Sequence, residues 1–304
     1  MTGAARGDGE FSSLTEVADE LRLDHRAIPP VRRESVAAGE GKRVSVVVWG
    51  EAEPELVFLH GGGQNARTWD LVALSLGRPA IAIDLPGHGH SSWRADRDYG
   101  PFRNAAAVAV AIQQLAARAR GVVGMSLGGL TAIRLGATRP DLVRKALLVD
   151  VTPGSPEAAQ RMNAAQRGPV QLTRGPRGFA RLEDMVQAAV QASPHRAPSA
   201  VRRGVVHNAR RLPDGTWAWR HDLGGLRSGS PLPDPGPLWA DLERLAMPAM
   251  LVTGGNSGFV TDADRDEVAR RLPSARIEVV PAAGHAVQSD QPRALSALIR
   301  EFIL

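Results

Sequence analysis

A serine enclosed by glycines is the feature of this 304-residue chain that most plainly suggests chemistry. Ser126 lies in Gly124-Met125-Ser126-Leu127-Gly128-Gly129, after the β-branched pair Val122-Val123 and before an apolar, alanine-rich run. This order predicts a strand, a sharp turn and a helix, which is the context in which a Gly-x-Ser-x-Gly sequence presents a nucleophilic hydroxyl. Gly124 and Gly128 would let strand and helix approach, because a side chain at either position would collide. The alternative is a turn of small residues without chemistry.

His285 and Asp150 are the predicted partners of this serine. A hydroxyl is a poor nucleophile at neutral pH, so it needs a base within hydrogen-bond reach, and the base needs an acceptor that orients it. His285 follows Gly284 after the last predicted strand, on a loop that can return to Ser126. Asp150 ends the predicted strand 144–150, and the carboxyl ends of strands in an open α/β sheet line the crevice where ligands bind. The order serine, acid, histidine fits a catalytic triad.

Asp262 and Asp264 are the alternative acids. They follow the next predicted strand beyond a glycine-rich loop, whereas Asp150 stands at the very end of its strand. We therefore favour Asp150 over the later pair. Without a catalytic role, Asp150 would cap the first turn of the segment that follows it.

Two backbone NH groups are predicted to stabilise the oxyanion that forms when Ser126 attacks a carbonyl. One belongs to Leu127, at the start of the helix after the serine. The other comes from Gly62, because the buried strand 56–59 ends in His60-Gly61-Gly62-Gly63, and three glycines let the backbone approach a ligand closely. A flexible turn is the alternative for these glycines. His60 is expected to pack and form hydrogen bonds beneath the loop.

Apolar runs along the chain predict the elements that place these residues. Continuous runs such as 56–59 are typical of strands buried on both faces, and they alternate with helical patterns. Besides the strand before Ser126, the predicted strands are 32–37, 43–49, 56–59, 80–84, 144–150, 216–220 after a turn at 213–215, 249–255 and 276–280. The predicted helices are 11–23, 69–76, 103–119, 130–137, 182–192, 199–210, 263–272 and 295–304.

The patterns also divide the chain into regions. Residues 1–30 read as a peripheral N-terminal extension, and residues 31–151 and 240–304 read as the core. Between them, residues 152–239 are rich in proline, glycine and arginine and are interpreted as a lid over the site. Four large side chains of this region are expected to form the core of the lid, or alternatively to wall an apolar pocket: Met162, Met185, Trp217 and Trp219.

The chain resembles the α/β-hydrolase superfamily at these residues. Its landmarks, in the order of the superfamily and within residues 43–304, are His60-Gly61-Gly62-Gly63, Asp84-Leu85-Pro86-Gly87-His88-Gly89, Gly124-Met125-Ser126-Leu127-Gly128-Gly129 and Gly284-His285. The resemblance implies the α/β-hydrolase fold, an eight-stranded, mostly parallel sheet with a helical lid inserted between strands six and seven. It also implies Ser126 as nucleophile, His285 as base, and the NH groups of Leu127 and Gly62 as oxyanion donors.

One position departs from the pattern of the superfamily. Members often carry the acid shortly after strand seven, in a Gly-x-x-Asp pattern, where this chain has Gly255-Asn256-Ser257-Gly258. A subset of lid-bearing relatives takes the acid from the end of strand six, where this chain has Asp150. The glycine at position 258 therefore supports Asp150, and it also leaves open a weakened triad.

The amino-acid composition of the chain argues against several classes of ligand and partner. The chain has no cysteine, which excludes disulfides and thiolate metal sites. Its net charge of +5 comes from basic residues scattered among acids, which indicates solvated faces and no nucleic-acid surface. We expect no membrane partner and a cytoplasmic location, because no apolar run could span a bilayer and the first 25 residues lack a signal sequence. His88 and His90 have no carboxylate at ligand spacing, so no metal is expected.

These residues predict a serine hydrolase that cleaves a small to medium apolar ester, lactone or related acyl compound through an acyl-enzyme, without a cofactor. A serine at the turn argues against the dehalogenases and epoxide hydrolases of the superfamily, which use a carboxylate there. One alternative is a carbon–carbon bond hydrolase of dienoate diketones, whose substrate carboxylate would need cations such as Arg202, Arg203 or Arg220. The other is a non-catalytic protein that binds a small ligand, for which Gly258 is the only support.

Overall fold

The computed structural model describes residues 9–39, 41–163, 167, 170, 172, 178–222, 234 and 236–304. Eight strands form the main sheet: β1 (Val31–Ala37), β2 (Arg43–Trp49), β3 (Leu56–Leu59), β4 (Ala80–Ile83), β5 (Gly121–Met125), β6 (Ala146–Val149), β9 (Ala249–Gly254) and β10 (Arg276–Val280). Their order in the sheet is β1-β2-β4-β3-β5-β6-β9-β10. The β1–β2 and β2–β4 pairs are antiparallel and the other pairs are parallel, which confirms the predicted α/β-hydrolase sheet.

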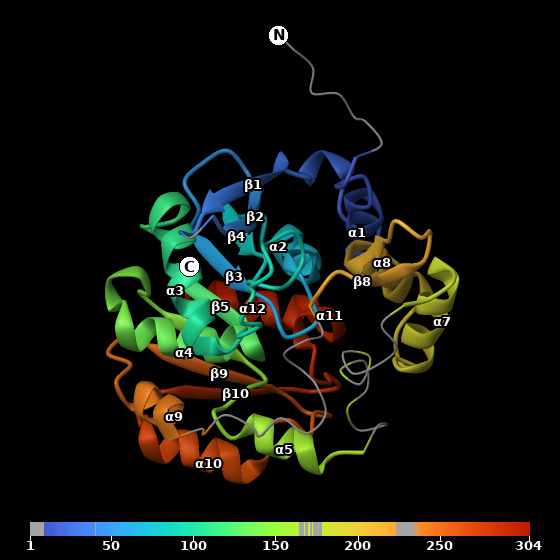
Figure 1. Cartoon of the computed structure of the whole chain (residues 1–304). Helices are drawn as coiled ribbons and strands as arrows, with labels where there is room; N and C mark the ends of the chain where they lie inside the picture. Colours follow the sequence, from blue (N-terminus) through green and yellow to red (C-terminus); the bar gives the residue numbers. More distant parts are fainter. Residues whose placement is uncertain are drawn as a thin grey trace.

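Helices cover both faces of this sheet (Figure 1). The α-helices are α1 (Leu14–Glu20), α2 (Asp70–Leu76), α3 (Pro101–Leu115), α4 (Leu127–Thr138), α5 (Ser155–Arg161), α7 (Leu182–Gln191), α8 (Pro198–Asn208), α9 (Gly236–Glu243), α10 (Asp262–Arg271), α11 (Val287–Asp290) and α12 (Pro292–Phe302). Short 3-10 helices are η1 (His25–Ala27), η2 (Ala66–Trp69) and η3 (Pro140–Leu142). Proline opens α3, α8 and α12 at a position where its missing NH costs no helical hydrogen bond.

The core lies in two layers because the side chains of each strand alternate between the faces of the sheet. In β3, Val57 and Leu59 join the layer under α3, α4, α9 and α10. Leu56 and Phe58 of the same strand join the layer under α1, α2, α11 and α12. All four side chains of β3 are fully buried, as the continuous apolar run predicts.

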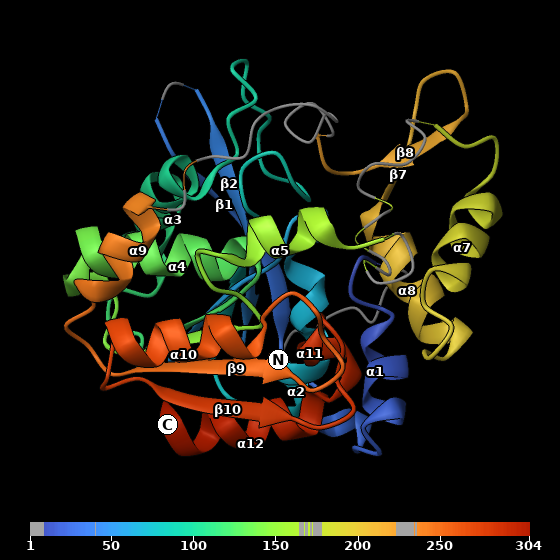
Figure 2. The same cartoon turned by 90° about the horizontal axis from the view of Figure 1, so that it is seen from below.

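The chain between β6 and β9 adds elements that lie outside the main sheet. Here the predicted helices are observed as α7 and α8, and the turn at 213–215 joins two short antiparallel strands, β7 (Ala209–Arg211) and β8 (Trp217–Trp219). Strand β7 was not predicted, because the charged Arg210 and Arg211 hide its pattern. Figure 2 shows α7, α8 and this hairpin grouped on one side of the molecule. Met185 and Trp219 are buried in a separate apolar cluster of this group.

We call residues 151–248, between Asp150 and β9, the inserted segment. It contains the predicted lid, residues 152–239, and the proposed division into an extension, a core and a lid stays a prediction. Residues 164–166, 168–169, 171, 173–177, 223–233 and 235 of that prediction lie outside the described residues.

Helix α1 of the predicted N-terminal extension packs against the core. Helix α1 buries Leu14, Val17 and Ala18 in the layer that contains α2. Arg67 in η2 donates to the carbonyl of Glu10 at 2.6 Å and to Ser13 Oγ at 3.2 Å. The predicted helix 11–23 is observed as α1, and its apolar residues all fall on the face that packs against this layer.

Candidate active site

Ser126 sits at a strained turn between β5 and α4. Its φ of 50° and ψ of −118° are unusual for a residue with a side chain, and such strain persists only where the surroundings impose it. A Cβ atom at Gly124 would lie 2.4 Å from the carbonyl oxygen of Gly128, and one at Gly128 would lie 2.3 Å from that of Leu59. The predicted need for glycine at both positions is therefore confirmed, and the close packing holds the serine at the end of the sheet.

Asp150 and His285 meet at the same end of the sheet. His285 Nδ1 lies 2.7 Å from Asp150 Oδ2, and because the carboxylate can only accept, Nδ1 carries the proton and Nε2 stays available. Asp150 is completely buried, so its oxygens need donors to replace water. The NH of Gly254 donates to Oδ1 at 2.9 Å, and Ser257 Oγ donates to Oδ2 at 2.5 Å. This environment orients the imidazole firmly.

The parallel pairing of β5 and β6 brings the serine and the acid to neighbouring strand ends. Met125 is paired with Val149, so the next residues, Ser126 and Asp150, leave adjacent strands at the same level. The NH of Ser126 donates to the carbonyl of Val149 at 3.1 Å. In the described part of the chain Ser126 Oγ makes no hydrogen bond. The hydrogen bond between a catalytic nucleophile and its base is often long in enzymes without substrate.

Asp262 and Asp264, the alternative acids, make contacts at the start of α10. Asp264 Oδ2 accepts from the NH of Thr261, and the Thr261 hydroxyl accepts from the NH of Asp264, which makes a capping box at the start of α10. The side chain of Asp262 is 90% exposed and pairs with Arg265. The structure places neither carboxylate on His285.

Gly258, where many relatives carry their acid, is packed against the inserted segment. A Cβ atom at this position would lie 2.9 Å from Cε of Met162, which is itself buried. The glycine therefore leaves room for a side chain of the inserted segment, while Asp150 supplies the carboxylate from the neighbouring strand.

Leu127 directly follows the serine, and Gly62 belongs to the glycine loop that lies over it. Leu127 is the first residue of α4, where a helical NH has no intrahelical partner. The glycine loop covers the serine closely, since a Cβ atom at Gly61 would lie 3.3 Å from that of Ser126. Among the described residues, the NH groups of Leu127 and Gly62 have no acceptor. Both are therefore free to bind a developing negative charge.

His60 holds the glycine loop from below, as predicted. Its Nε2 accepts from the NH of Leu85 at 2.9 Å, which leaves Nδ1 to donate to the carbonyl of Gly61 at 2.8 Å. Burial, with a smaller contribution from nearby His88, lowers the pKa of His60 to about 3. His60 is therefore neutral at ordinary pH and serves as a fixed hydrogen-bonding spacer.

Two contacts around His285 were missed at the level of sequence. The ring of Phe259 stacks on the imidazole with 3.7 Å between ring centroids and an interplanar angle of 16°. Ser257 binds Asp150, as described above. Both residues lie on the loop after β9, and nothing in their spacing identifies them, because the contacts depend on how that loop folds back over the sheet.

The arginines that a dienoate carboxylate would need are engaged elsewhere. Arg202 pairs with Glu183 at 2.6 Å, and Arg203 pairs with Glu20 of α1 at 2.5 Å. Arg220 donates to the carbonyl of Ala209 at 3.0 Å, while its buried Nε has no partner among the described residues. The pairs of Arg202 and Arg203 weaken the specific support for a carbon–carbon bond hydrolase.

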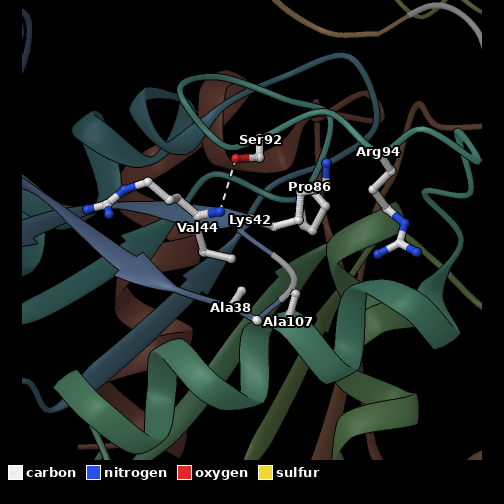
Figure 3. A pocket seen from close by; sticks show the side chains of 9 residues that line it. Ala38, Lys42, Val44, Pro86, Ser92, Arg94 and Ala107 are labelled. Carbon is white, nitrogen blue, oxygen red and sulfur yellow. Dashed lines mark hydrogen bonds between the residues drawn. The ribbon is translucent and has the colours of Figure 1, made fainter.

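Metal ligands and cavities do not point to a second centre. No group of three or more histidine, aspartate or glutamate side chains in the described ranges could hold a metal ion. His88 Nδ1 instead donates to the carbonyl of Pro86 at 3.0 Å. A cavity of about 40 Å³ lies at the end of the β1–β2 hairpin, where Lys42, Ser92 and Arg94 are among its lining residues (Figure 3). It shares no residue with the cluster around Ser126.

Comparison with known sequences identifies the class of protein to which this fold and this cluster belong. The sequence profile of the Alpha/beta hydrolase family matches residues 56–298. The chain belongs to the alpha/beta hydrolase family. Among the described residues, no helix is long and apolar enough to cross a membrane.

Individual relatives are similar over most of the chain. Esterase Rv0045c of Mycobacterium tuberculosis (strain ATCC 25618 / H37Rv) is 47% identical over 295 residues, which cover 97% of this chain and 95% of that protein. A solved structure of the M. tuberculosis esterase Rv0045c has a TM-score of 0.84 and covers 97% of this chain and 98% of its own. The sn-1-specific diacylglycerol lipase ABHD11 of Mus musculus is 27% identical over 256 residues, 82% of this chain and 81% of the lipase.

Proposed function

We propose that the protein is a serine esterase that hydrolyses small to medium apolar carboxylic esters. The observation that carries the proposal is the 2.7 Å contact between His285 and the buried Asp150, one strand away from a strained serine turn. The 47% identity to an esterase supports the reaction type.

The first half of the reaction forms an acyl-enzyme. Ser126 Oγ attacks the ester carbonyl while His285 Nε2 takes its proton, and Asp150 stabilises the resulting imidazolium through Nδ1. The negative charge on the carbonyl oxygen is stabilised by the NH groups of Leu127 and Gly62. His285 then returns the proton to the departing alkoxide, which leaves as an alcohol.

The second half releases the acid. Water replaces the alcohol, His285 removes one of its protons, and the hydroxide attacks the acyl carbonyl over the same two NH groups. Collapse of this intermediate expels Ser126 Oγ, which recovers the proton from His285. These steps use Ser126, His285, Asp150 and the two NH groups without a cofactor, and the partner of the protein is a small to medium apolar substrate. We also propose a cytoplasmic location, which is supported by the lack of cysteine.

A fluorophosphonate probe and a series of nitrophenyl esters test the proposal together. We expect stoichiometric labelling and turnover of short-chain esters by the wild-type protein, and loss of both in Ser126→Ala. Asp262→Asn is the matched control, because that carboxylate is exposed and away from His285. An unlabelled wild-type protein that binds but does not cleave esters would instead identify a ligand-binding member of the family.

A further inference from the structure

The groups of the proposed reaction are held in two different ways. Ser126 and Asp150 directly follow β5 and β6, so the hydrogen bonds of the sheet fix their backbone. Gly62 and His285 instead lie on loops, and a loop needs contacts of its own to stay in one conformation. Two of those contacts come from one short stretch of the inserted segment, residues 196–208.

The first contact reaches the glycine loop. Asn208, the last residue of α8, donates from Nδ2 to the carbonyl of Gly63. In the opposite direction, Asn65 Nδ2 donates to the carbonyl of His207 at 3.1 Å. Gly63 has a φ of 75° and follows Gly62 directly, so holding its carbonyl restricts the turn that aims the Gly62 NH.

The second contact reaches the histidine loop. Arg196, two residues before α8, donates from Nε to Asp290 Oδ1 at 2.7 Å. The other oxygen of Asp290 accepts from the NH of Gly284 at 2.9 Å, and Gly284 directly precedes His285. Only 4% of the Asp290 side chain is exposed, so this carboxylate depends on protein donors, and a charge-assisted pair in such a site is strong and directional.

The stretch that makes these contacts is itself fixed to the core. His207 Nε2 lies 3.0 Å from Ser13 Oγ, and Arg203 pairs with Glu20 of α1. Helix α1 is buried against the sheet, as described above. The chain of contacts therefore runs from the buried N-terminal helix, through α8, to both loops of the site.

We propose that residues 196–208 form a brace that sets the geometry of the site, with Asn208 positioning the oxyanion loop and Arg196 positioning the histidine loop through Asp290. The proposal rests on the proposed esterase function. Neither side chain is a catalytic residue, because each acts through another residue. The inserted segment thus contributes to the rate of the reaction, beyond any role in covering the substrate.

Steady-state kinetics on a nitrophenyl ester, normalised to sites titrated with fluorophosphonate, test the brace. Asn208→Ala is expected to lower kcat per titrated site about tenfold with KM little changed, because a displaced NH is lost mainly in the transition state. The affinity for a trifluoromethyl ketone, which mimics the oxyanion, should fall in parallel. If Asn208→Ala does not fold, Asn208→Asp removes the donor while keeping the volume.

Arg196→Ala is expected to lower kcat per site by a similar factor, and Arg196→Lys should restore part of the loss. The acid limb of its pH–rate profile should also move, since the loop that carries His285 is released. The double variant should show the product of the two single effects, because the contacts act on separate loops. Arg202→Ala is the control from the same helix, since its exposed pair with Glu183 stays within the inserted segment, and its kcat should stay within twofold of the wild type.

Two results would overturn the brace. One is a wild-type rate per titrated site in both Asn208→Ala and Arg196→Ala. The other is a loss that appears only as fewer titratable sites, which indicates a role in folding alone. Failure of the esterase proposal looks different, because the wild-type protein itself would then neither be labelled nor cleave esters.

Discussion

The main sheet and the inserted segment are built on different principles. Each strand from β3 to β6 is buried along its whole length, and the sheet is held by apolar layers on both faces. Within the inserted segment, α7, α8 and the β7–β8 hairpin have a small apolar cluster of their own and are joined to the rest by polar contacts such as those of Arg196 and Asn208, whereas α9 packs in one layer of the main core. The sheet therefore fixes where the proposed nucleophile and acid stand, while the inserted segment holds the loops that complete the site.

The largest effect is expected at a strand end. Asp150→Asn should reduce kcat about 10⁴-fold, because the amide favours the wrong imidazole tautomer. Its unfolding temperature should change much less. The measurement is ester turnover beside thermal unfolding, with Asp262→Asn as control. A nearly normal Asp150→Asn and an inactive Asp262→Asn would reverse the assignment of the acid.

Substitutions that leave a cavity in the main core or in the cluster of α7, α8 and the hairpin should show whether the two regions unfold separately. Phe58 is fully buried and stacks on Trp69 with 5.0 Å between centroids, so Phe58→Ala should cost about 3–5 kcal/mol and lower hydrogen-exchange protection throughout. Met185→Ala should cost about 2–5 kcal/mol by the same reasoning, but the loss of protection should be confined to α7, α8 and the β7–β8 hairpin. Equal losses everywhere in both variants would mean that the two regions unfold as one unit.

Acid should weaken the inserted segment through its buried histidines. Burial, with nearby charged or histidine neighbours, lowers the pKa of both His207 and His221 to about 3, against an ordinary value of 6.5. The unfolded chain therefore binds more protons between these values, so stability is complete above about pH 6.5 and falls as the pH drops toward 3. Each histidine contributes up to about 1.4 kcal/mol per pH unit.

Urea unfolding between pH 7.5 and pH 4.5 measures this slope. His221→Phe keeps a flat ring between His88 and Trp219 and cannot take up a proton, so its slope should be shallower than that of the wild type. An unchanged slope in this variant would show that His221 is not the acid-sensitive group.

The smallest effect is expected at Ser257. Ser257→Ala removes one of the donors to Asp150, while the Gly254 NH and His285 remain, so kcat should fall about tenfold or less. Ser257→Thr keeps the hydroxyl and should recover much of the rate. A loss as large as that of Asp150→Asn would mean that the acid depends on this loop more than on its strand.

Sequence reasoning worked best where structure depends on local pattern. Apolar runs predicted the sheet, and the glycines around Ser126 predicted the tight packing that is observed at Gly124 and Gly128. The family was likewise indicated by local motifs and is confirmed by comparison. The meeting of Asp150 with His285 followed from a rule about strand ends, and the catalytic roles of these residues stay predictions.

It worked least well where contacts join distant parts of the chain. The burial of α1 depends on a sheet layer completed by the C-terminal helices, and the stacking of Phe259 on His285 depends on loop conformation. The partners of Arg196 and Asn208 lie on separate loops, so no spacing within the inserted segment reveals them. Pairings of this kind are set by tertiary geometry, which a single sequence does not display.

The positive φ of 50° at both Ser126 and Asp150 has a practical consequence. Glycine would adopt this conformation without the cost of about 1–2 kcal/mol that a side chain incurs there. Laboratory evolution toward heat resistance would thus be drawn to replace the very two groups on which ester cleavage depends. Selection for heat-resistant variants of this protein should therefore measure ester turnover in every round. Stabilising substitutions should be sought on the outer surfaces of the helices.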